Sequence, residues 1–585
     1  MRHRHRQIKE EGALPACLTL CGAFLPCLLA SLLILLLHEV ACASYHRPPS
    51  PLFLPRYCSP RLEARIWRMA EEDETTVRHA YKESPSWSWP ATTSMQRKFS
   101  FGAICGFALL LRMMLSLQPY SGAGVAPKYG DYEAQRHWME ITVHTPVKEW
   151  YVNTTNNDLR YWGLDYPPLT AYQSWIHGRI IHALEPAAVA LNTSRGHEDA
   201  RSKFLMRWTV LSSDILVFFP AALAFVSLYY KLAIFEEQAW ALSMILLQPA
   251  LILIDHGHFQ FNCISLGLAA GAAAAVVSRH ELVACVLYSL SLNHKQMSAY
   301  YAPAFFAHLL GRCIQRRSPV FGVVKLGIMV LTTFTICWWP FLSSRHSALQ
   351  VLNRLAPFER GLYEDYVANF WCGTSMLIKW KQLFSVPVLA RLALGATITA
   401  ALPSMVQQIR APSARGFLLA MLNSSFAFYF FSFQVHEKSV LLPLLPATLL
   451  ALEEPGLLQW LVPYAVVSML PLLRRDDLVL PYFALLALFF LLLKCPRHFE
   501  YKIAEDKLIK IFRAPILRNC SLAGAAILHL LYFYVQPPPR YSFLFEAFIT
   551  SYCFAHFLVL FIYANCKQWY VPGDGQWVSS SKKIN

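Results

Sequence analysis

G-D-Y-E-A-Q-R-H-W-M-E-I-T occupies residues 130–142, and W-G-L-D-Y-P-P-L-T-A-Y occupies residues 162–172. Both strings lie in a polar stretch, residues 118–205, that separates two apolar segments. The stretch is rich in carboxylate, histidine and aromatic side chains, whereas most other connections between apolar segments are short. A long polar loop of this kind, carried by an apolar scaffold, indicates chemistry at a membrane surface.

The composition indicates a polytopic membrane protein. Of the 585 residues, 55% are hydrophobic and only 15% are charged, against roughly 25% charged residues in an ordinary soluble domain. Many apolar runs reach or approach the roughly 20 residues that cross a bilayer as a helix. We therefore predict an all-α fold with about fourteen transmembrane helices, at residues 99–117, 206–230, 237–254, 261–278, 281–293, 297–311, 319–342, 384–402, 415–434, 438–452, 456–473, 477–494, 517–536 and 545–565.

The net charge of +16 fits the excess of basic residues that membrane proteins carry in their cytosolic loops. No basic and aromatic module predicts nucleic-acid binding. Arg97 and Lys98 precede the first span, so we expect that end in the cytosol and residues 118–205 in a lumen. An even number of spans returns the tail, residues 566–585, to the cytosol. The terminal K-K-I-N resembles a retrieval signal of the endoplasmic reticulum.

Residues 1–94 differ from the multi-span domain at residues 95–565. They contain an apolar, leader-like run followed by a Pro-rich and then a polar stretch. Insertion or cleavage of this run conflicts with a cytosolic position for Arg97 and Lys98. We therefore expect that translation starts at Met95 or that the run does not insert.

The large loop is expected to carry two interfacial helices. Residues 132–151 lack Gly and contain one Pro, and Trp138, Trp150 and Tyr151 would lie at headgroup level. A second helix opens at Y-P-P-L, since proline suits a first turn, and runs to about Leu184. Asp131 and Asp165 directly precede these helices, so each could be an N-terminal cap or a residue that does chemistry.

On this topology the lumenal loops are few, and most side chains capable of chemistry gather in them. The loops are residues 118–205, 255–261, 293–296, 343–382, 434–438, 474–476 and 537–544. For some of these groups, other interpretations than a role in catalysis are open. H-E-K at residues 436–438 could be a solvated turn. Asp255, His256 and His258 could suggest a metal site, but their spacing does not place all three on one helix face.

The two strings of the large loop resemble the endoplasmic-reticulum glucosyltransferases that use dolichyl-phosphate glucose. These are multi-span, GT-C-type glycosyltransferases with a catalytic first lumenal loop. The resemblance extends over residues 99–565 and includes D-H-G-H-F-Q-F-N at 255–262, N-H-K-Q-M at 293–297, V-A-N-F-W-C at 367–372 and F-S-F-Q-V-H-E-K-S-V-L-L-P at 431–443. The first-loop sequence favours the member that adds the first glucose to the lipid-linked high-mannose oligosaccharide. The sister enzyme that adds the second glucose is the alternative.

The resemblance implies an inverting transfer that makes an α-1,3 glucoside. The donor is dolichyl phosphate β-glucose, and the acceptor is a dolichyl-pyrophosphate-linked oligosaccharide. Asp131 matches the family's catalytic aspartate and is the predicted base. The residues predicted to position the acceptor or support the base are Asp165, Glu133, Arg136, His137, Trp138 and Tyr166.

Positive charge is expected beside the leaving phosphate. The candidates are His436, Lys438 and Lys295, with Arg354 and Arg360 as weaker ones. Asp255, His258 and Gln260 are expected to line the cavity. No metal or other cofactor is expected, because the donor has a monophosphate rather than a nucleotide diphosphate.

A lipid or solute transporter is the main alternative from another class. Composition by itself favours it, because most chains with this many spans move a solute or lipid. The single long first loop and the lack of a repeat between the halves argue against it. Charges inside the predicted spans, such as Asp214 and Lys325, are also few.

Overall fold

The computed structural model describes residues 94–355, 362, 366–494 and 515–573. The chain divides into two units, Met1–Gln96 and Arg97–Asn585, and the second is described below. The predicted leader and linker, Arg360 and the terminal K-K-I-N lie outside the described residues.

Every regular element in these residues is a helix, as predicted. The α-helices are α3 (Ser94–Ser116), α4 (Gly130–His144), α5 (Pro168–Leu184), α6 (Ala200–Ser213), α7 (Phe219–Tyr229), α8 (Phe235–Leu246), α9 (Pro249–Ile252), α10 (Asn262–Val277), α11 (Glu281–His294), α12 (Ala302–Ile314), α13 (Pro319–Trp338), α14 (Arg345–Leu355), α15 (Phe370–Thr374), α16 (Trp380–Leu383), α17 (Val386–Arg410), α18 (Ala414–Phe431), α19 (Leu441–Leu449), α20 (Pro455–Ser468), α21 (Leu470–Arg475), α22 (Val479–Lys494), α25 (Pro515–Tyr534) and α26 (Leu544–Trp569). Short 3₁₀ or π segments are η1 (Val147–Glu149), η2 (Pro186–Val189), η3 (Asp214–Phe218), η4 (Leu253–Phe259), η5 (Gln296–Tyr301), η6 (Trp339–Ser343), η7 (Glu437–Val440) and η8 (Pro539–Tyr541).

Six described stretches are long and apolar enough to cross a membrane. They are Met95–Ser116, Ala200–Tyr229, Phe235–Phe259, Pro319–Ser343, Val386–Arg410 and Leu544–Trp569. The membrane character of the chain is therefore supported, whereas the count of about fourteen spans stays a prediction.

Several of the other predicted spans form short helices. α11 has 14 residues, or about 21 Å at 1.5 Å per residue, less than the roughly 30 Å of a hydrocarbon core. It ends where the chain turns to present Lys295, and α19 follows the turn that carries Lys438. Non-helical backbone is tolerated at membrane depth where it lines a cavity, so these interruptions are compatible with a membrane-embedded fold.

Small side chains allow the central helices to approach closely. α10 is rich in alanine and packs against α7, α11 and η3. A Cβ on Gly267 would lie 2.9 Å from the Cα of Phe218, so only glycine fits at this crossing. Close packing through Gly and Ala is the usual way in which helices associate in membranes.

A buried ion pair joins three elements of the scaffold. Arg112 Nε of α3 lies 2.7 Å from Asp214 Oδ2 of η3, and His256 Nε2 of η4 lies 2.5 Å from the same oxygen. Asp214 was predicted as a charge within a span, whereas its partner Arg112 was not predicted. Charged groups at such depth usually pair with one another.

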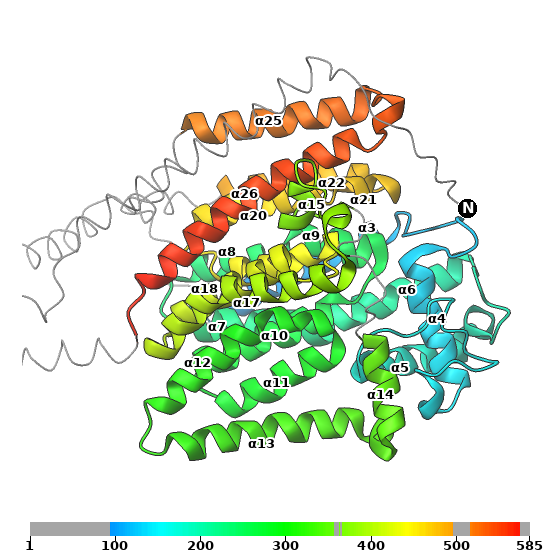
Figure 1. The fold of residues 1–585 in the computed structure, drawn as a ribbon, viewed down its shortest axis with the longest axis horizontal. Coiled ribbons are helices and arrows are strands. Elements are labelled where there is room, and N and C mark those ends of the chain that lie inside the picture. The colour runs from blue at the N-terminus through cyan, green and yellow to red at the C-terminus, as the bar shows by residue number, and fades with distance from the viewer. Residues whose placement is uncertain (1–93, 356–361, 363–365, 495–514, 574–585) are drawn as a thin grey trace, which may run out of the picture. The chain divides into compact units, whose positions relative to one another are not determined.

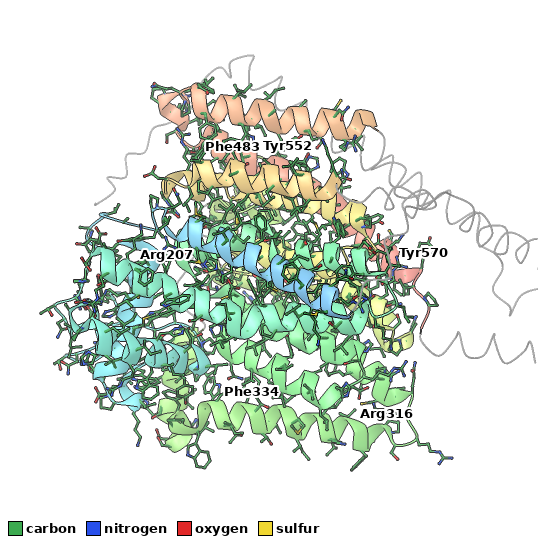
Figure 2. All side chains as sticks on the ribbon, turned by 180° about the vertical axis from the view of Figure 1, so that it is seen from behind. Arg207, Arg316, Phe334, Phe483, Tyr552 and Tyr570 are labelled. Carbon is green, nitrogen blue, oxygen red and sulfur yellow. The ribbon has the colours of Figure 1, made fainter. Side chains whose placement is uncertain are left out.

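α4, α5 and α14 lie together at one end of the longer helices, while α13 and α25 form opposite edges (Figure 1). Seen from behind, the labelled Arg316 and Tyr570 lie at the end away from α4 and α5 (Figure 2). Arg316 follows α12 and forms an ion pair with Glu281 at 2.5 Å. Arg316, a basic residue of the loop after α12, thus lies at the end opposite α4 and α5.

The prediction of an interfacial helix over residues 132–151 is wrong in extent and in setting. α4 ends at His144 because Thr145 precedes a proline and adopts an extended conformation. Every residue of α4 from 132 to 142 is buried. Trp138, Trp150 and Tyr151 pack in a cluster with Phe341 of η6 rather than at a membrane surface. The second predicted helix corresponds to α5 and is confirmed.

Candidate active site

The start of α4 is shaped by two residues in the left-handed region. Tyr129 has φ 58° and Gly130 has φ 69°. A Cβ on Gly130 would lie 2.6 Å from the Ser121 carbonyl oxygen, so glycine is needed for both its conformation and its size. The turn places Asp131 in the first turn of the helix.

Neither candidate aspartate is an N-terminal cap. The residue at the cap position of α4 is Tyr129, and that of α5 is Pro167. The carboxylate of Asp131 instead bonds to side chains from distant parts of the sequence. The capping alternative left open by the sequence therefore does not apply to either residue.

One oxygen of Asp131 receives three contacts. Its Oδ2 lies 2.7 Å from Lys438 Nζ, 2.5 Å from Gln260 Nε2 and 3.1 Å from His258 Nε2. The side chain is 26% exposed. Within the described residues its Oδ1 has no hydrogen-bond partner, so this oxygen remains available to a molecule in the cavity.

The charge of Asp131 is strongly stabilised. Burial by itself would raise the pKa of this carboxyl, but the charge and hydrogen bond of Lys438, and those of His258 when its imidazole is protonated, outweigh that effect and hold the pKa well below its usual range. The carboxylate is therefore ionised at neutral pH.

A strained turn at the end of η4 brings His258 and Gln260 to Asp131. Phe259 between them is fully buried and has φ 87°, a conformation that bulky residues rarely adopt. The guanidinium of Arg207 holds this segment by donating to the carbonyls of His256 and Gly257. Strain of this kind persists where the surrounding structure enforces it, often at functional sites.

Asp131 lines a cavity of about 1090 Å³. The predicted site residues that also line it are Trp138, Asp165, Tyr166, His258, Gln260, Lys295, Arg354, His436 and Lys438. They come from α4, the loop before α5, η4 and the residue after it, the turn after α11, α14, and η7 with the residue before it. The structure therefore brings together residues separated by up to 307 positions in sequence.

Lys295 is linked to Asp131 indirectly, through the side-chain amide of Gln260. Its Nζ lies 3.1 Å from Gln260 Oε1 and 2.6 Å from Asn262 Oδ1, and it lies over the ring of Tyr166. Burial lowers the pKa of Lys295 below its usual range. A neighbouring anion such as a phosphate would favour its charged form.

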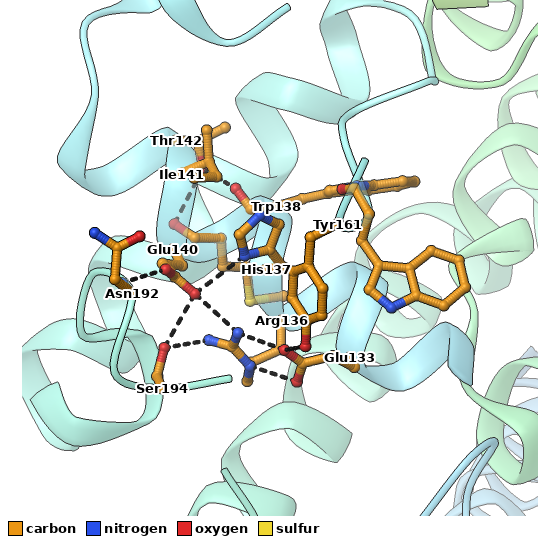
Figure 3. Close-up of polar contacts among 12 residues, drawn as sticks. Glu133, Arg136, His137, Trp138, Glu140, Ile141, Thr142, Tyr161, Asn192 and Ser194 are labelled. Carbon is orange, nitrogen blue, oxygen red and sulfur yellow. Dashed lines mark hydrogen bonds and ion pairs between the residues drawn. The ribbon is translucent and has the colours of Figure 1, made fainter. Parts of the chain in front are cut away.

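Glu133, Arg136 and His137 do not line the cavity, although we predicted that they support the acceptor or the base. Residues of a helix two, five and six positions after Asp131 lie on the opposite face, whereas Gln135 and Trp138 share its face. Figure 3 shows the three side chains in a buried cluster with Glu140 and Ser194. Arg136 contacts Glu133 at 2.7 Å and Glu140 at 2.8 Å. Any effect of this cluster on the site acts through the position of α4.

Asp255, His256 and His258 point to different partners. Asp255 accepts from Asn262 and from the backbone N–H of Cys263, His256 contacts Asp214, and only His258 reaches the cavity. Asp255 therefore supports Asn262 at the start of α10 rather than lining the cavity as predicted. Among the described residues no group of three His, Cys, Asp or Glu side chains is arranged to hold a metal ion.

Asp476 is a site residue that the sequence analysis missed. Its Oδ2 lies 2.5 Å from His258 Nδ1, and it lines the cavity at the end of α21. The signal was present, because residues 474–476 fall in one of the predicted lumenal loops. The string R-R-D-D at residues 474–477 has a net charge of zero, and nothing in the sequence pairs Asp476 with His258.

The sequence comparison decides the family. The model of the ALG6, ALG8 glycosyltransferase family matches residues 108–563. The chain belongs to the ALG6, ALG8 glycosyltransferase family. A relative from Arabidopsis thaliana, named as a probable dolichyl pyrophosphate Man9GlcNAc2 alpha-1,3-glucosyltransferase, is 54% identical and covers 85% of this chain and 95% of the relative. A Gallus gallus relative, named as dolichyl pyrophosphate Man9GlcNAc2 alpha-1,3-glucosyltransferase, is 40% identical and covers 78% of this chain and 94% of the relative.

Membership in the ALG6, ALG8 family confirms the resemblance inferred from the two loop strings. The matched residues include Asp131 and the other cavity-lining residues named above. A glycosyltransferase family accounts for a long polar loop on a membrane scaffold, and nothing in the comparisons favours the transporter alternative.

Proposed function

We propose that this chain transfers glucose from dolichyl phosphate β-glucose to the terminal mannose of a dolichyl-pyrophosphate-linked high-mannose oligosaccharide. The product is an α-1,3 glucoside formed with inversion. The names of relatives such as that at 54% identity support this acceptor and linkage. The observation that carries the chemistry is that Asp131 lines the cavity while three side chains hold its Oδ2, and its Oδ1 has no partner among the described residues.

In this reaction Asp131 is the general base. Its carboxylate accepts the proton of the acceptor hydroxyl as that oxygen forms a bond to the glucose C1 atom. The bond from C1 to the phosphate oxygen breaks on the opposite face, and dolichyl phosphate leaves. A positioned base of this kind typically contributes about 10²–10⁴-fold to the rate.

Lys438 is suited to couple donor binding to the strength of the base. In the resting site its ammonium stabilises the Asp131 carboxylate at 2.7 Å, which makes this carboxylate a weak base. A donor phosphate would attract the same ammonium, and the basicity of Asp131 would rise as Lys438 moves towards the phosphate. Lys295 and His436 line the same cavity and supply further donors to the phosphate.

We place the enzyme in the endoplasmic-reticulum membrane with the cavity on the lumenal side and both ends of the multi-span domain in the cytosol. About fourteen spans with a large first lumenal loop fit this arrangement. Arg316 lies at the end opposite α4 and α5 (Figure 2), as expected if basic loops face the cytosol.

The test uses purified protein, dolichyl phosphate glucose and two lipid-linked acceptors, with and without one glucose, in EDTA. Only the unglucosylated acceptor should gain a hexose, and the removal of divalent metal should not matter. Asp131→Asn should abolish transfer, whereas Asp158→Asn, at an exposed position of the same loop, should not.

Transfer only to the singly glucosylated acceptor would assign the sister activity and leave the proposed base in place. Full activity of Asp131→Asn would remove the base assignment. Loss of activity in EDTA that added Mg²⁺ restores would overturn the metal-independent mechanism.

A further inference from the structure

His258 connects Asp131 to a second carboxylate. Its Nε2 lies 3.1 Å from Asp131 Oδ2, and its Nδ1 lies 2.5 Å from Asp476 Oδ2. The side chains of His258 and Asp476 are each 2% exposed. An Asp–His–Asp chain thus runs from the cavity into the protein, and the role proposed for Asp131 does not by itself require its inner two members.

The geometry determines which nitrogen of the imidazole carries hydrogen. A carboxylate only accepts, so the contact with Asp476 requires hydrogen on Nδ1. In the neutral ring Nε2 then carries a lone pair, which accepts from Lys438 Nζ at 3.2 Å, and Asp131 Oδ2 at 3.1 Å receives a hydrogen bond from Nε2 only once the ring is protonated. Asp476 therefore selects the tautomer in which Nε2 is able to take up a proton.

We propose that His258 receives the proton that Asp131 takes from the acceptor, and that Asp476 is a positioning residue that holds His258 ready for it. This inference rests on Asp131 being the base. The O–H bond of the acceptor breaks and its proton binds Oδ1 of Asp131; rotation of the carboxyl group then presents this proton to Nε2 of His258, which lies 3.1 Å from Oδ2 in the resting site. Asp131 is again a carboxylate, and the imidazolium lies between two carboxylates until it loses the proton to solvent.

Other charged groups face this chain from several elements. Lys438 and Glu437 of η7 act on it from one side, Lys295 from the turn after α11, and Arg207 from α6. The two carboxylates, Asp131 and Asp476, stabilise an imidazolium, whereas the cations destabilise it. Removal of Asp476 shifts this balance against the protonated ring.

The test is the pH dependence of kcat at saturating donor and acceptor. In the wild type kcat should fall on the acid side as His258 becomes protonated before the reaction and is no longer able to accept a proton. Asp476→Asn removes the carboxylate that stabilises the imidazolium, so the acid limb should move to lower pH. The plateau should fall about 10- to 100-fold, less than the loss expected for the base itself.

Two variants separate this role from a structural one. Asp477→Asn makes the same chemical change at the neighbouring, exposed residue and should leave the acid limb in place. Asp476→Glu retains a carboxylate and should return the limb towards the wild-type position. Thermal unfolding and size-exclusion profiles in detergent check that each variant is folded.

A folded Asp476→Asn protein whose rate falls equally at all pH values, or does not fall, would overturn the inference. If Asp476→Asn does not fold, His258→Gln takes its place: this variant lacks the imidazole, and an acid limb that persists in it unchanged would overturn the inference. Failure of the proposed function is distinguishable, since it would appear as transfer activity in Asp131→Asn whatever Asp476 does.

Discussion

The two oxygens of Asp131 have different surroundings. Oδ2 has contacts with η7, with the end of η4 and with the residue that follows it, while Oδ1 has no partner among the described residues. A carboxylate fixed through one oxygen keeps its orientation, and its other oxygen is positioned to take a proton. Lys438 contributes both to this orientation and to the positive charge of the cavity, so its removal should affect both.

Lys438→Met should lower kcat/KM for the donor by about 10²–10³-fold, the loss typical of one removed charge-stabilising donor. The measurement is glucosyl transfer as a function of donor concentration. Lys148→Met, at an exposed position outside the cavity, is the control and should retain wild-type kinetics. An unchanged kcat/KM in Lys438→Met would show that another cation meets the phosphate.

At the scale of elements, α4 is held by the face that does not line the cavity. Glu140 is at the centre of this attachment, with contacts to Arg136 at 2.8 Å, His137 at 3.2 Å and the backbone N–H of Asn192 at 2.7 Å. Figure 3 shows that the cluster joins α4 to the loop that carries Ser194. The cluster thereby limits the movement of the helix whose first turn bears Asp131.

Glu140→Gln should destabilise the protein by about 3–5 kcal/mol, because it leaves the buried Arg136 without one of its carboxylates. Glu185→Gln is a matched control, since Glu185 pairs with Arg201 at the surface, and such pairs contribute about 0–1 kcal/mol. Thermal unfolding in detergent measures both. Equal, small losses of stability in Glu140→Gln and Glu185→Gln would show that the buried cluster does not stabilise the protein more than the surface pair does.

The lowered pKa of Glu140 predicts that the stability of the protein depends on pH. Burial raises the pKa of Glu140, but the hydrogen bond of His137 and the charge of Arg136 outweigh it and lower the pKa to about 2. The stabilising contribution is complete above the unfolded-state pKa of about 4.3 and is lost as the pH falls from there towards 2. Glu140→Gln should therefore lose less stability than the wild type between about pH 4.5 and 3. Parallel curves for the two proteins would contradict this prediction.

At the scale of the whole molecule, the Arg112–Asp214 pair ties α3 to the centre of the scaffold. The side chain of Arg112 is 0% exposed and that of Asp214 is 1% exposed. Arg112→Met and Asp214→Leu should each cost about 3–5 kcal/mol, because each leaves an uncompensated buried charge, whereas the double variant should cost less than either. Unfolding temperatures of the four proteins test this, and additive losses would contradict it.

The proposed topology also predicts glycosylation. N-T-T at residues 153–155 and N-T-S at residues 192–194 lie in the large loop, and Asn153 and Asn192 are exposed. A glycosidase that removes N-glycans should therefore shift the protein, and Asn153→Gln with Asn192→Gln should abolish the shift. Since Ser194 is buried against Arg136 and Glu140, modification of Asn192 must precede folding of the cluster. Modification of Asn423, which lies inside α18, would contradict the topology.

The sequence by itself determined the class of this protein and the identity of the base candidate. Composition and apolar run lengths are sums over local residues, so they predicted an all-helical membrane protein without any knowledge of contacts. The loop strings led to the family and to Asp131, Lys438 and Lys295 because these motifs are contiguous in sequence. They could not show that Asp131 and Lys438, 307 positions apart, would meet.

Only the tertiary structure decided which faces of the elements look into the cavity and which partners lie behind them. Glu133, Arg136 and His137 stand beside Asp131 in the sequence, yet the helical rotation turns them away from the cavity. Asp476 lies far from every recognised string and joins the site because α21 ends next to η4. Contacts of this kind depend on how separate helices pack, and packing is a property of the whole chain rather than of any one segment.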